Sequence, residues 1–139
     1  MTPNSPRPAG PRLTVADAMD LCDYQVAEDH TAEQADDVLR GTHADYLAVR
    51  GHDGRCEGLV TRAGLRPFVH LSGTAERTVG DTAHQQGPFA WPTLGLALAI
   101  RVMDTMRWRV WPVIDDDGYL LGVLTADRAA GAIEAAASA

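Results

Sequence analysis

The hydrophobic and polar positions in the first half of the chain predict a short series of strands and helices. Apolar residues recur between Ala32 and Leu39 at the spacing of one helical face. Asp29 is the predicted N-cap of this helix, and Gly41 is its predicted end. The predicted elements are an extended piece at 14–15, a helical turn at 16–19, a strand at 24–27, a helix from 29 to about 40, strands at 46–49 and 56–61, and a helix from 62 to about 69.

The second half of the chain has the same pattern with more strongly hydrophobic segments. Thr93 stands at the position of Asp29, and either side chain can cap a helix. The helix that follows is apolar on most faces, so we expect it to contact both the first half and another subunit. The predicted elements are a strand at 89–91, a helix from 92 to about 106, strands at 110–114 and 119–125, and a helix from 127 to about 136.

One constant offset, the spacing from Thr14 to Thr78, relates the two halves of the chain without a gap. A unit of about 60 residues buries too little surface to be robust alone, so two copies should pack on each other. We therefore expect ligand clefts between the copies. The segments that return are Thr14-Val15-Ala16-Asp17 as Thr78-Val79-Gly80-Asp81, Asp53-Gly54 as Asp117-Gly118, and Gly58-Leu59-Val60-Thr61 as Gly122-Val123-Leu124-Thr125.

The predicted fold class is mixed α/β, of the α+β kind, with two β-α-β-β-α repeats related by a pseudo-two-fold axis. The repeats are predicted at 13–71 and 77–136, with a linker at 72–77. Residues 1–12 contain four prolines and no apolar run, which predicts a disordered tail rather than a signal peptide. No apolar stretch is long enough to span a bilayer, so no membrane association is expected.

Composition narrows the classes of function. The net charge of −7 argues against a nucleic-acid binder, which needs a dense basic surface. The basic residues are arginines and are scattered, with only Arg107 and Arg109 close together. Cys22 and Cys56 are too far apart in the sequence for a Cys-x-x-Cys pair, which argues against a disulfide framework and favours a reducing cytoplasm.

No motif in the sequence predicts catalysis or metal binding. The five histidines lack metal-ligand spacing, and the acidic run 115–117 lacks the further ligands of a calcium loop. No nucleophile stands in a known motif with a base, and no phosphate-loop lysine is present. The sequence therefore predicts a protein without catalytic residues, without a metal site, and without enzymatic activity.

The order of these segments resembles a tandem CBS-domain pair, also called a Bateman module. The second copy carries the fuller match, TMRWRVWPVIDDDGYLLGVLTADRAAGAI from Thr105 to Ile133, with Pro112 where the family usually has a proline. The first copy, HADYLAVRGHDGRCEGLVTRAGL, matches more loosely and has Ala48 at that position. The resemblance covers about residues 13–133.

The resemblance implies a regulatory module rather than an enzyme. CBS pairs typically bind adenine nucleotides or related adenosyl compounds between the repeats, commonly form homodimers, and modulate another protein. The expected regulatory ligand is therefore AMP, ADP, ATP or S-adenosylmethionine, and the expected partners are a second copy and an effector protein in trans. The alternative is a dimerisation or scaffold domain whose clefts have lost ligand binding.

The end of each repeat's second hairpin strand is the predicted phosphate-binding end. There a strand gives way at once to a helix, whose N–H groups and dipole favour anions, and Thr61 or Thr125 adds a hydroxyl. Both threonines can also be simple N-caps. The predicted ligand-binding residues are Thr125, Asp127, Arg128, Val110, Trp111, Pro112, Thr61, Leu47 and Ala48.

The sequence departs from the family pattern at the position that usually holds the ribose. An Asp is expected three residues after each threonine, but Gly64 and Arg128 stand there, and Asp127 comes one residue early. A neighbouring helical position is rotated by about 100°. Arg128 is an alternative contact for a phosphate. The three tryptophans, all in the second copy, can stack on adenine or serve only in packing.

Overall fold

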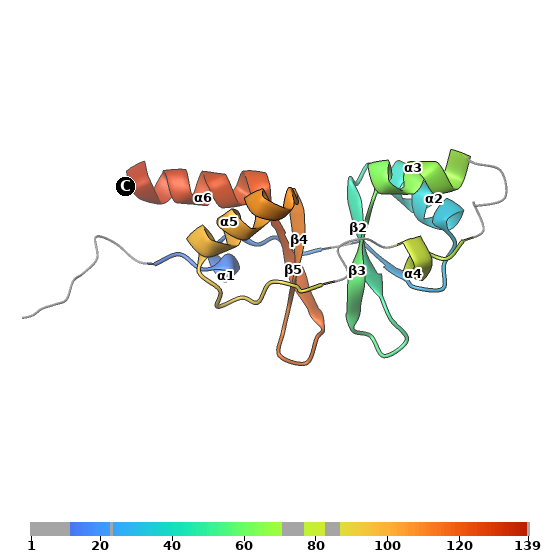
Figure 1. Ribbon diagram of the computed structural model, residues 1–139, viewed down its shortest axis with the longest axis horizontal. Coiled ribbons are helices and arrows are strands. Elements are labelled where there is room, and N and C mark those ends of the chain that lie inside the picture. Colours follow the sequence, from blue (N-terminus) through green and yellow to red (C-terminus); the bar gives the residue numbers. More distant parts are fainter. Residues whose placement is uncertain (1–11, 23, 71–76, 83–86, 139) are drawn as a thin grey trace, which may run out of the picture.

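The computed structural model describes residues 12–22, 24–70, 77–82 and 87–138. Two lobes lie side by side, with their sheets facing each other in the middle and their helices on the outside (Figure 1). The predicted tail and most of the predicted linker lie outside the described residues, so the repeat boundaries at 13–71 and 77–136 stay predictions.

The first lobe contains a three-stranded sheet in the order β1-β2-β3. The β1 strand is parallel to β2, and β2 and β3 form an antiparallel hairpin. Two helices cover the outer face of this sheet (Figure 1). The elements are β1 (Gln25–Ala27), α2 (Ala32–Thr42), β2 (Tyr46–Arg50), β3 (Cys56–Thr61) and α3 (Arg62–His70).

The second lobe follows the same order with a shorter sheet. The β4 and β5 strands form an antiparallel hairpin, and the strand predicted at 89–91 is reduced to one parallel bridge between Ala90 and Val113. The elements are α5 (Leu96–Met106), β4 (Val110–Ile114), β5 (Leu120–Thr125) and α6 (Ala126–Ser138).

The constant offset between the halves is confirmed as a structural repeat. Helices α2 and α5 begin and end at positions that this offset relates, as do the strands of the two hairpins. Each hairpin has its register shift at the same place, after Val49 and after Val113. Both helices end at a residue in the left-handed conformation, His43 in one lobe and Arg107 in the other. The predicted α+β class and pseudo-two-fold arrangement therefore hold.

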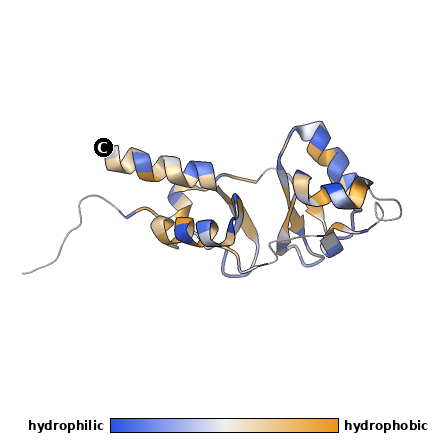
Figure 2. Ribbon diagram, turned by 45° about the horizontal axis from the view of Figure 1, so that its top comes forward, coloured by the Kyte–Doolittle hydropathy of each residue, from blue (hydrophilic) through white to orange (hydrophobic). Residues whose placement is uncertain are grey.

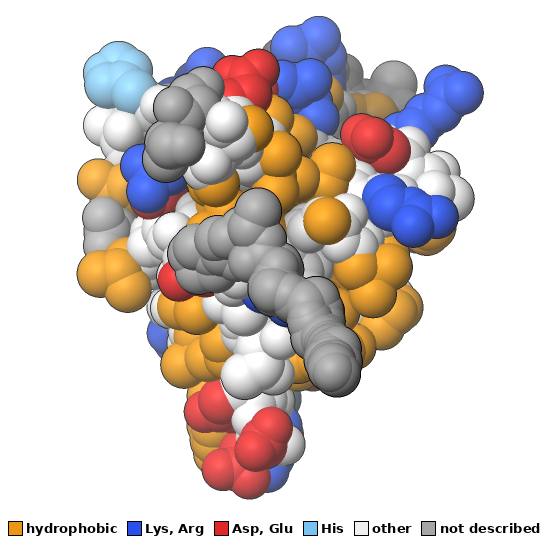
Figure 3. All heavy atoms as spheres, turned by 90° about the vertical axis from the view of Figure 1, so that its left-hand side faces the viewer, with side chains coloured by type: hydrophobic (Ala, Val, Ile, Leu, Met, Phe, Trp, Pro, Cys, Tyr) orange, Lys and Arg blue, Asp and Glu red, His pale blue; other side chains and the backbone are white. Residues whose placement is uncertain are grey.

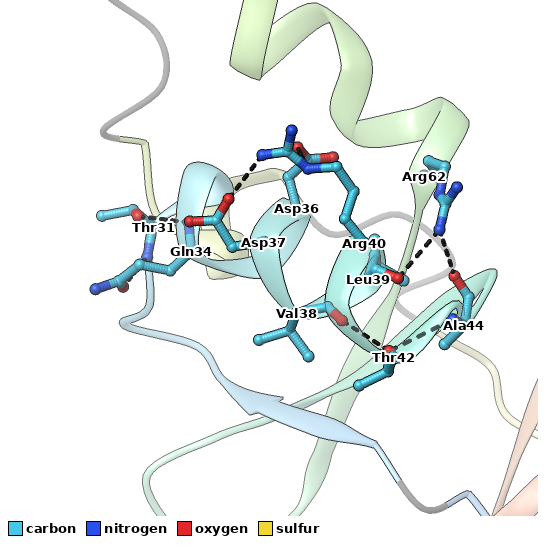
Figure 4. A network of polar contacts seen from close by, with 10 residues as sticks. All are labelled: Thr31, Gln34, Asp36, Asp37, Val38, Leu39, Arg40, Thr42, Ala44 and Arg62. Atoms are coloured by element: carbon cyan, nitrogen blue, oxygen red, sulfur yellow. Dashed lines mark hydrogen bonds and ion pairs between the residues drawn. The ribbon is translucent and has the colours of Figure 1, made fainter.

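The predicted helix caps were wrong by two residues. Helix α2 is capped by Thr31 rather than Asp29, because Thr31 and Gln34 form a reciprocal capping box (Figure 4). Helix α5 begins after Gly95 rather than at 92–93. The end of α2 also lies beyond Gly41, since the left-handed residue that ends it is His43.

Each lobe is completed by a helical turn that belongs to the other half of the chain. The turn α1 (Val15–Ala18) packs on the second lobe, where the Val15 N–H donates to the Leu94 carbonyl at 2.8 Å. The turn α4 (Val79–Thr82) packs on the first, where the Val79 N–H donates to the His30 carbonyl at 2.8 Å. These two bonds join equivalent positions, so the exchange is reciprocal.

The hydrophobic core is divided between the lobes in the same reciprocal way. Val15, from α1, is fully buried in the core of the second lobe, and Val79, from α4, is fully buried in the core of the first. The helices of the first lobe mix hydrophilic and hydrophobic residues, whereas α6 is mostly weakly hydrophobic (Figure 2). Within the described residues, no helix is both long enough and apolar enough to cross a membrane.

A close backbone approach ties the chain leading out of α1 to the edge of the second sheet. Asp20 and Val123 exchange two backbone hydrogen bonds of 2.8 Å. A Cβ atom at Gly122 would overlap the carbonyl oxygen of Asp20. In the second lobe, this close approach therefore explains why the repeated Gly-h-h-Thr segment, where h is apolar, begins with glycine.

Replacing Gly122 with Ala should lower the free energy of unfolding by about 1–3 kcal/mol, because the backbone of Asp20 has to move away. Urea unfolding measures this change. The control is Gly131→Ala, since a Cβ there meets nothing within 4 Å and alanine favours the helix. Equal stability of the two variants would contradict the role of Gly122.

Candidate functional site

At one end of the interface between the lobes, the two hairpin turns are joined. The Arg55 Nε donates to the Asp117 carbonyl at 2.6 Å, and its guanidinium lies 5.4 Å from the centre of the Tyr119 ring. The Cys56 N–H donates to the Gly118 carbonyl at 2.9 Å. These contacts hold the two sheets together at the ends of the strands that lie away from the threonines.

Ionisable groups near this contact have shifted pKa values. The pKa of Asp53 is lowered because its carboxylate accepts hydrogen bonds from the backbone and side chain of Arg55, and the pKa of Arg55 is raised by the same partner. Burial raises the pKa of Cys56 to about 11. Its thiol therefore stays neutral at physiological pH and is a poor nucleophile.

At the other end of the interface, the lobes border a cavity of about 740 Å³ that is open to solvent on one side. Both halves contribute equivalent positions to it, such as Thr61 and Thr125, so the two predicted phosphate-binding ends open into one shared space. The lining residues are Asp45, Tyr46, Leu59, Thr61, Arg62, Ala63, Arg66, Arg107, Trp108, Arg109, Val110, Thr125 and Asp127.

Both threonines cap the helices that begin at the cavity. The Thr61 Oγ1 accepts from the Gly64 N–H at 3.0 Å, and the Thr125 Oγ1 accepts from the Arg128 N–H at 3.2 Å. The N-cap role considered for both residues is therefore confirmed. It also points the N-terminal ends of α3 and α6 toward the cavity.

Four arginines line the cavity, and two of them have partners within the protein. Arg62 donates to the carbonyls of Leu39 and Ala44 at 3.0 and 3.2 Å, which ties α3 to the end of α2 (Figure 4). Arg109 lies 3.6 Å from the carboxylate of Asp127. The remaining pair, Arg66 and Arg107, come from opposite lobes.

One part of the cavity wall is apolar and aromatic. Tyr46 and Leu59 come from the first hairpin, and Trp108 and Val110 come from the chain entering β4. The Trp108 ring lies 5.8 Å from that of Trp111, at an interplanar angle of 41°. The site therefore combines aromatic and apolar side chains with basic ones, which suits a ligand with a ring and an anionic group.

Comparison with known proteins identifies the fold. Residues 86–135 match the family model of the CBS domain. The solved structure of CBSX2 in complex with AMP is similar, with a TM-score of 0.78 and 24% identity over 88% of this chain and 97% of that chain. The chain therefore has the fold of a CBS-domain pair, and its second half matches the CBS domain.

Two further CBS structures are also similar. The CBS domain pair of protein MJ0100, in complex with 5-methylthioadenosine and S-adenosyl-L-methionine, has a TM-score of 0.76 and 14% identity over 90% of this chain and 98% of that chain. The cytosolic domain of the Mg²⁺ channel MgtE in complex with ATP has a TM-score of 0.70 and 21% identity over 83% of this chain and 46% of that chain. No curated protein sequence matches this chain.

The fold brings four of the nine predicted ligand-binding residues to the cavity: Thr61, Thr125, Asp127 and Val110. Arg128 is absent from the lining and pairs with Asp20 at 3.3 Å, on the connection out of α1. The other four do not line it and are buried in the two central hairpins: Leu47, Ala48, Trp111 and Pro112.

Trp111 illustrates why these buried strand residues miss the cavity. Only 3% of Trp111 is exposed, and its indole Nε1 donates to the Pro88 carbonyl at 2.9 Å. These surroundings agree with the packing role considered for Trp111. Trp108, which was not among the predicted ligand-binding residues, lines the cavity instead.

Sequence reasoning did not identify the four arginines as part of the site. The closeness of Arg107 and Arg109 was a visible signal, but Arg62 and Arg66 gave none, because their equivalent positions in the second copy are Ala126 and Ala130. Folding brings these two pairs together from opposite lobes.

A second cavity, of about 530 Å³, has the opposite electrostatic character. Its lining includes four acidic side chains, and Glu28 among them lies 3.2 Å from His52. Carboxylates repel phosphate, so this cavity is a poor phosphate site. Within the described residues, no group of three or more His, Cys, Asp or Glu side chains is placed to hold a metal ion. The acidic side chains are Glu28, Asp29, Glu57 and Asp81.

Proposed function

We propose that this CBS pair is a regulatory module that binds an adenine nucleotide or a related adenosyl metabolite in the 740 Å³ cavity between its repeats. Binding changes how the two lobes pack, and an effector protein in trans responds to that change. The observation that carries the proposal is a single cavity lined by both repeats, with aromatic and basic groups on its walls.

The ligands of similar structures support the adenosyl part of the proposal. Those structures hold AMP, ATP, or 5-methylthioadenosine with S-adenosylmethionine. In this chain Trp108 and Tyr46 offer aromatic faces for an adenine ring, and Thr61 and Thr125 stand where phosphate would approach the helices. Asp127, one of the two carboxylates that line the cavity, is the proposed contact for a ribose hydroxyl in place of the family's usual Asp.

The competing function is a scaffold that has lost its ligand. The absent family carboxylates at Gly64 and Arg128 favour it. The cavity favours ligand binding instead, because a cleft that served only for packing would be filled by side chains. We also propose a cytoplasmic location, because neither Cys22 nor Cys56 is in a disulfide bond.

The proposal predicts a large thermal shift with one adenosyl compound among AMP, ADP, ATP, S-adenosylmethionine and NAD, with GTP as a comparison. A ligand at about 100 times its Kd stabilises by about 2.7 kcal/mol, which raises Tm by on the order of 10 °C here. The fluorescence of Trp108 should change in the same titration, because its ring faces the cavity.

A matched pair of variants separates specific binding from general stabilisation. Thr125→Ala should reduce the ligand-induced shift, since it removes a hydroxyl at the predicted phosphate end, while costing about 1 kcal/mol of stability through the lost N-cap. Thr105→Ala is the control, since its hydroxyl bonds only within α5, to the Arg101 carbonyl. If no compound shifts Tm and Trp108 fluorescence stays constant, the scaffold function replaces the proposed one.

We also propose that a second copy of the chain covers the outer face of α5. Equivalent positions of α2 and α5 differ in polarity: Gln34 is matched by Leu98, and Thr42 by Met106. Leu98 and Met106 are 52% and 51% exposed, so apolar side chains stand where the first lobe has polar ones. The end view of the second lobe has hydrophobic side chains across its middle and charged ones toward its edges (Figure 3). Such a face is typical of a homodimer interface.

Leu98→Asp should convert a dimer of about twice 14.9 kDa into a monomer, because the charge would be buried in the interface. Size-exclusion chromatography with light scattering measures the mass. Leu21→Asp is the matched control, since Leu21 is 77% exposed and lies in the connection after α1. A wild-type protein that is monomeric at high micromolar concentration would overturn the dimer.

A further inference from the structure

Two of the basic side chains that line the cavity form no polar contact with the described part of the chain. Among the described residues, the guanidinium groups of Arg66 and Arg107 have neither an ion pair nor a hydrogen-bond partner. In contrast, Arg62 donates to backbone carbonyls and Arg109 pairs with Asp127. Arg66 lies on α3 of the first lobe, and Arg107 is the left-handed residue that ends α5 of the second. Both face the same 740 Å³ space.

These two arginines do not follow the repeat. The position equivalent to Arg66 is Ala130, and the position equivalent to Arg107 is His43. The threonines and strand ends around the cavity are related by the pseudo-two-fold axis, but these two cations are not. A cavity built this way presents one asymmetric set of contacts, which suits one ligand in one orientation rather than two equivalent ligands.

The backbone adds two further donors at equivalent positions. At the start of α3, the first N–H donates to the Asp45 carbonyl and the third N–H donates to the Thr61 hydroxyl. At the start of α6, the first N–H donates to the Arg109 carbonyl and the third N–H donates to the Thr125 hydroxyl. The second N–H of each helix belongs to Ala63 or Asp127. Both residues line the cavity, and neither N–H has a partner among the described residues.

The net charge of the lining also indicates an anion with several charges. Four guanidinium groups face two carboxylates, those of Asp45 and Asp127. Asp127 is already paired with Arg109. A monophosphate can satisfy one helix end and its nearest arginine, whereas a chain of two or three phosphoryl groups can reach basic groups of both lobes. A sulfonium cation would meet repulsion here.

We propose that this cavity binds one nucleoside di- or triphosphate per chain, with Arg66 and Arg107 holding its polyphosphate from opposite lobes. The inference rests on the proposed function and narrows its ligand: ADP and ATP bind more tightly than AMP, and S-adenosylmethionine is rejected. Because the two arginines belong to different lobes, the bound polyphosphate fixes the lobes relative to each other.

Isothermal titration of the full chain with adenosine, AMP, ADP, ATP, S-adenosylmethionine and inorganic tripolyphosphate tests the inference. Affinity should rise with each phosphoryl group of the nucleotide. The stoichiometry of ATP binding should be about one molecule per chain. Arg66→Gln and Arg107→Gln should each weaken ATP binding about tenfold or more and AMP binding less than about threefold. Both side chains are exposed, so the variants should fold normally, as circular dichroism checks.

The matched control is Arg50→Gln, at the other end of the first hairpin and outside the cavity, which should leave every affinity unchanged. If nucleotide affinity depends neither on the number of phosphates nor on Arg66 and Arg107, this inference is overturned, but the proposed function stands. Tripolyphosphate binding that both variants weaken, without nucleotide binding, would support the anion site and overturn the adenosyl ligand. Binding of none of these compounds would overturn both.

Discussion

The reciprocal exchange of α1 and α4 is the constraint on which the rest of the structure depends. Neither half of the chain closes its own core, because fully buried Val15 belongs to the second lobe and fully buried Val79 to the first. The core of each lobe is therefore incomplete without a segment from the other half, and backbone hydrogen bonds at equivalent positions fix the pseudo-two-fold relation between the lobes. That relation places the ends of β3 and β5, and the helices that follow them, around one cavity.

The interface between the lobes has different chemistry at its two ends. At the hairpin turns, Arg55 joins its own turn to that of the other lobe through Asp117 and Tyr119. At the threonine end the two lobes border the cavity, and Arg66 and Arg107 face this common space. An interface that is joined at one end and borders a cavity at the other can respond to an anion in that cavity. This asymmetry is the physical basis of the proposal that the molecule is a sensor.

Local features of this fold could be predicted from the sequence, whereas contacts between the halves could not. The hairpins, the helices and the capping threonines follow from periodicity and from Gly-h-h-Thr, which act within a few residues. Asp29 and Thr31 are both residue types that cap helices, and the reciprocal contact with Gln34 is what identifies Thr31 as the cap. The exchange of α1 and α4 uses backbone bonds, which leave no side-chain pattern. The arginine cluster combines segments that are distant in the sequence, such as those of Arg66 and Arg107.

The central claim is that both repeats hold one anionic nucleotide in the cavity they share. A crystal structure of the chain grown with ATP tests this most directly. The account predicts one nucleotide per chain, with its phosphates between Arg66 and Arg107 and its base against Trp108. A nucleotide contacted by one repeat alone, or two nucleotides bound at equivalent positions, would contradict it.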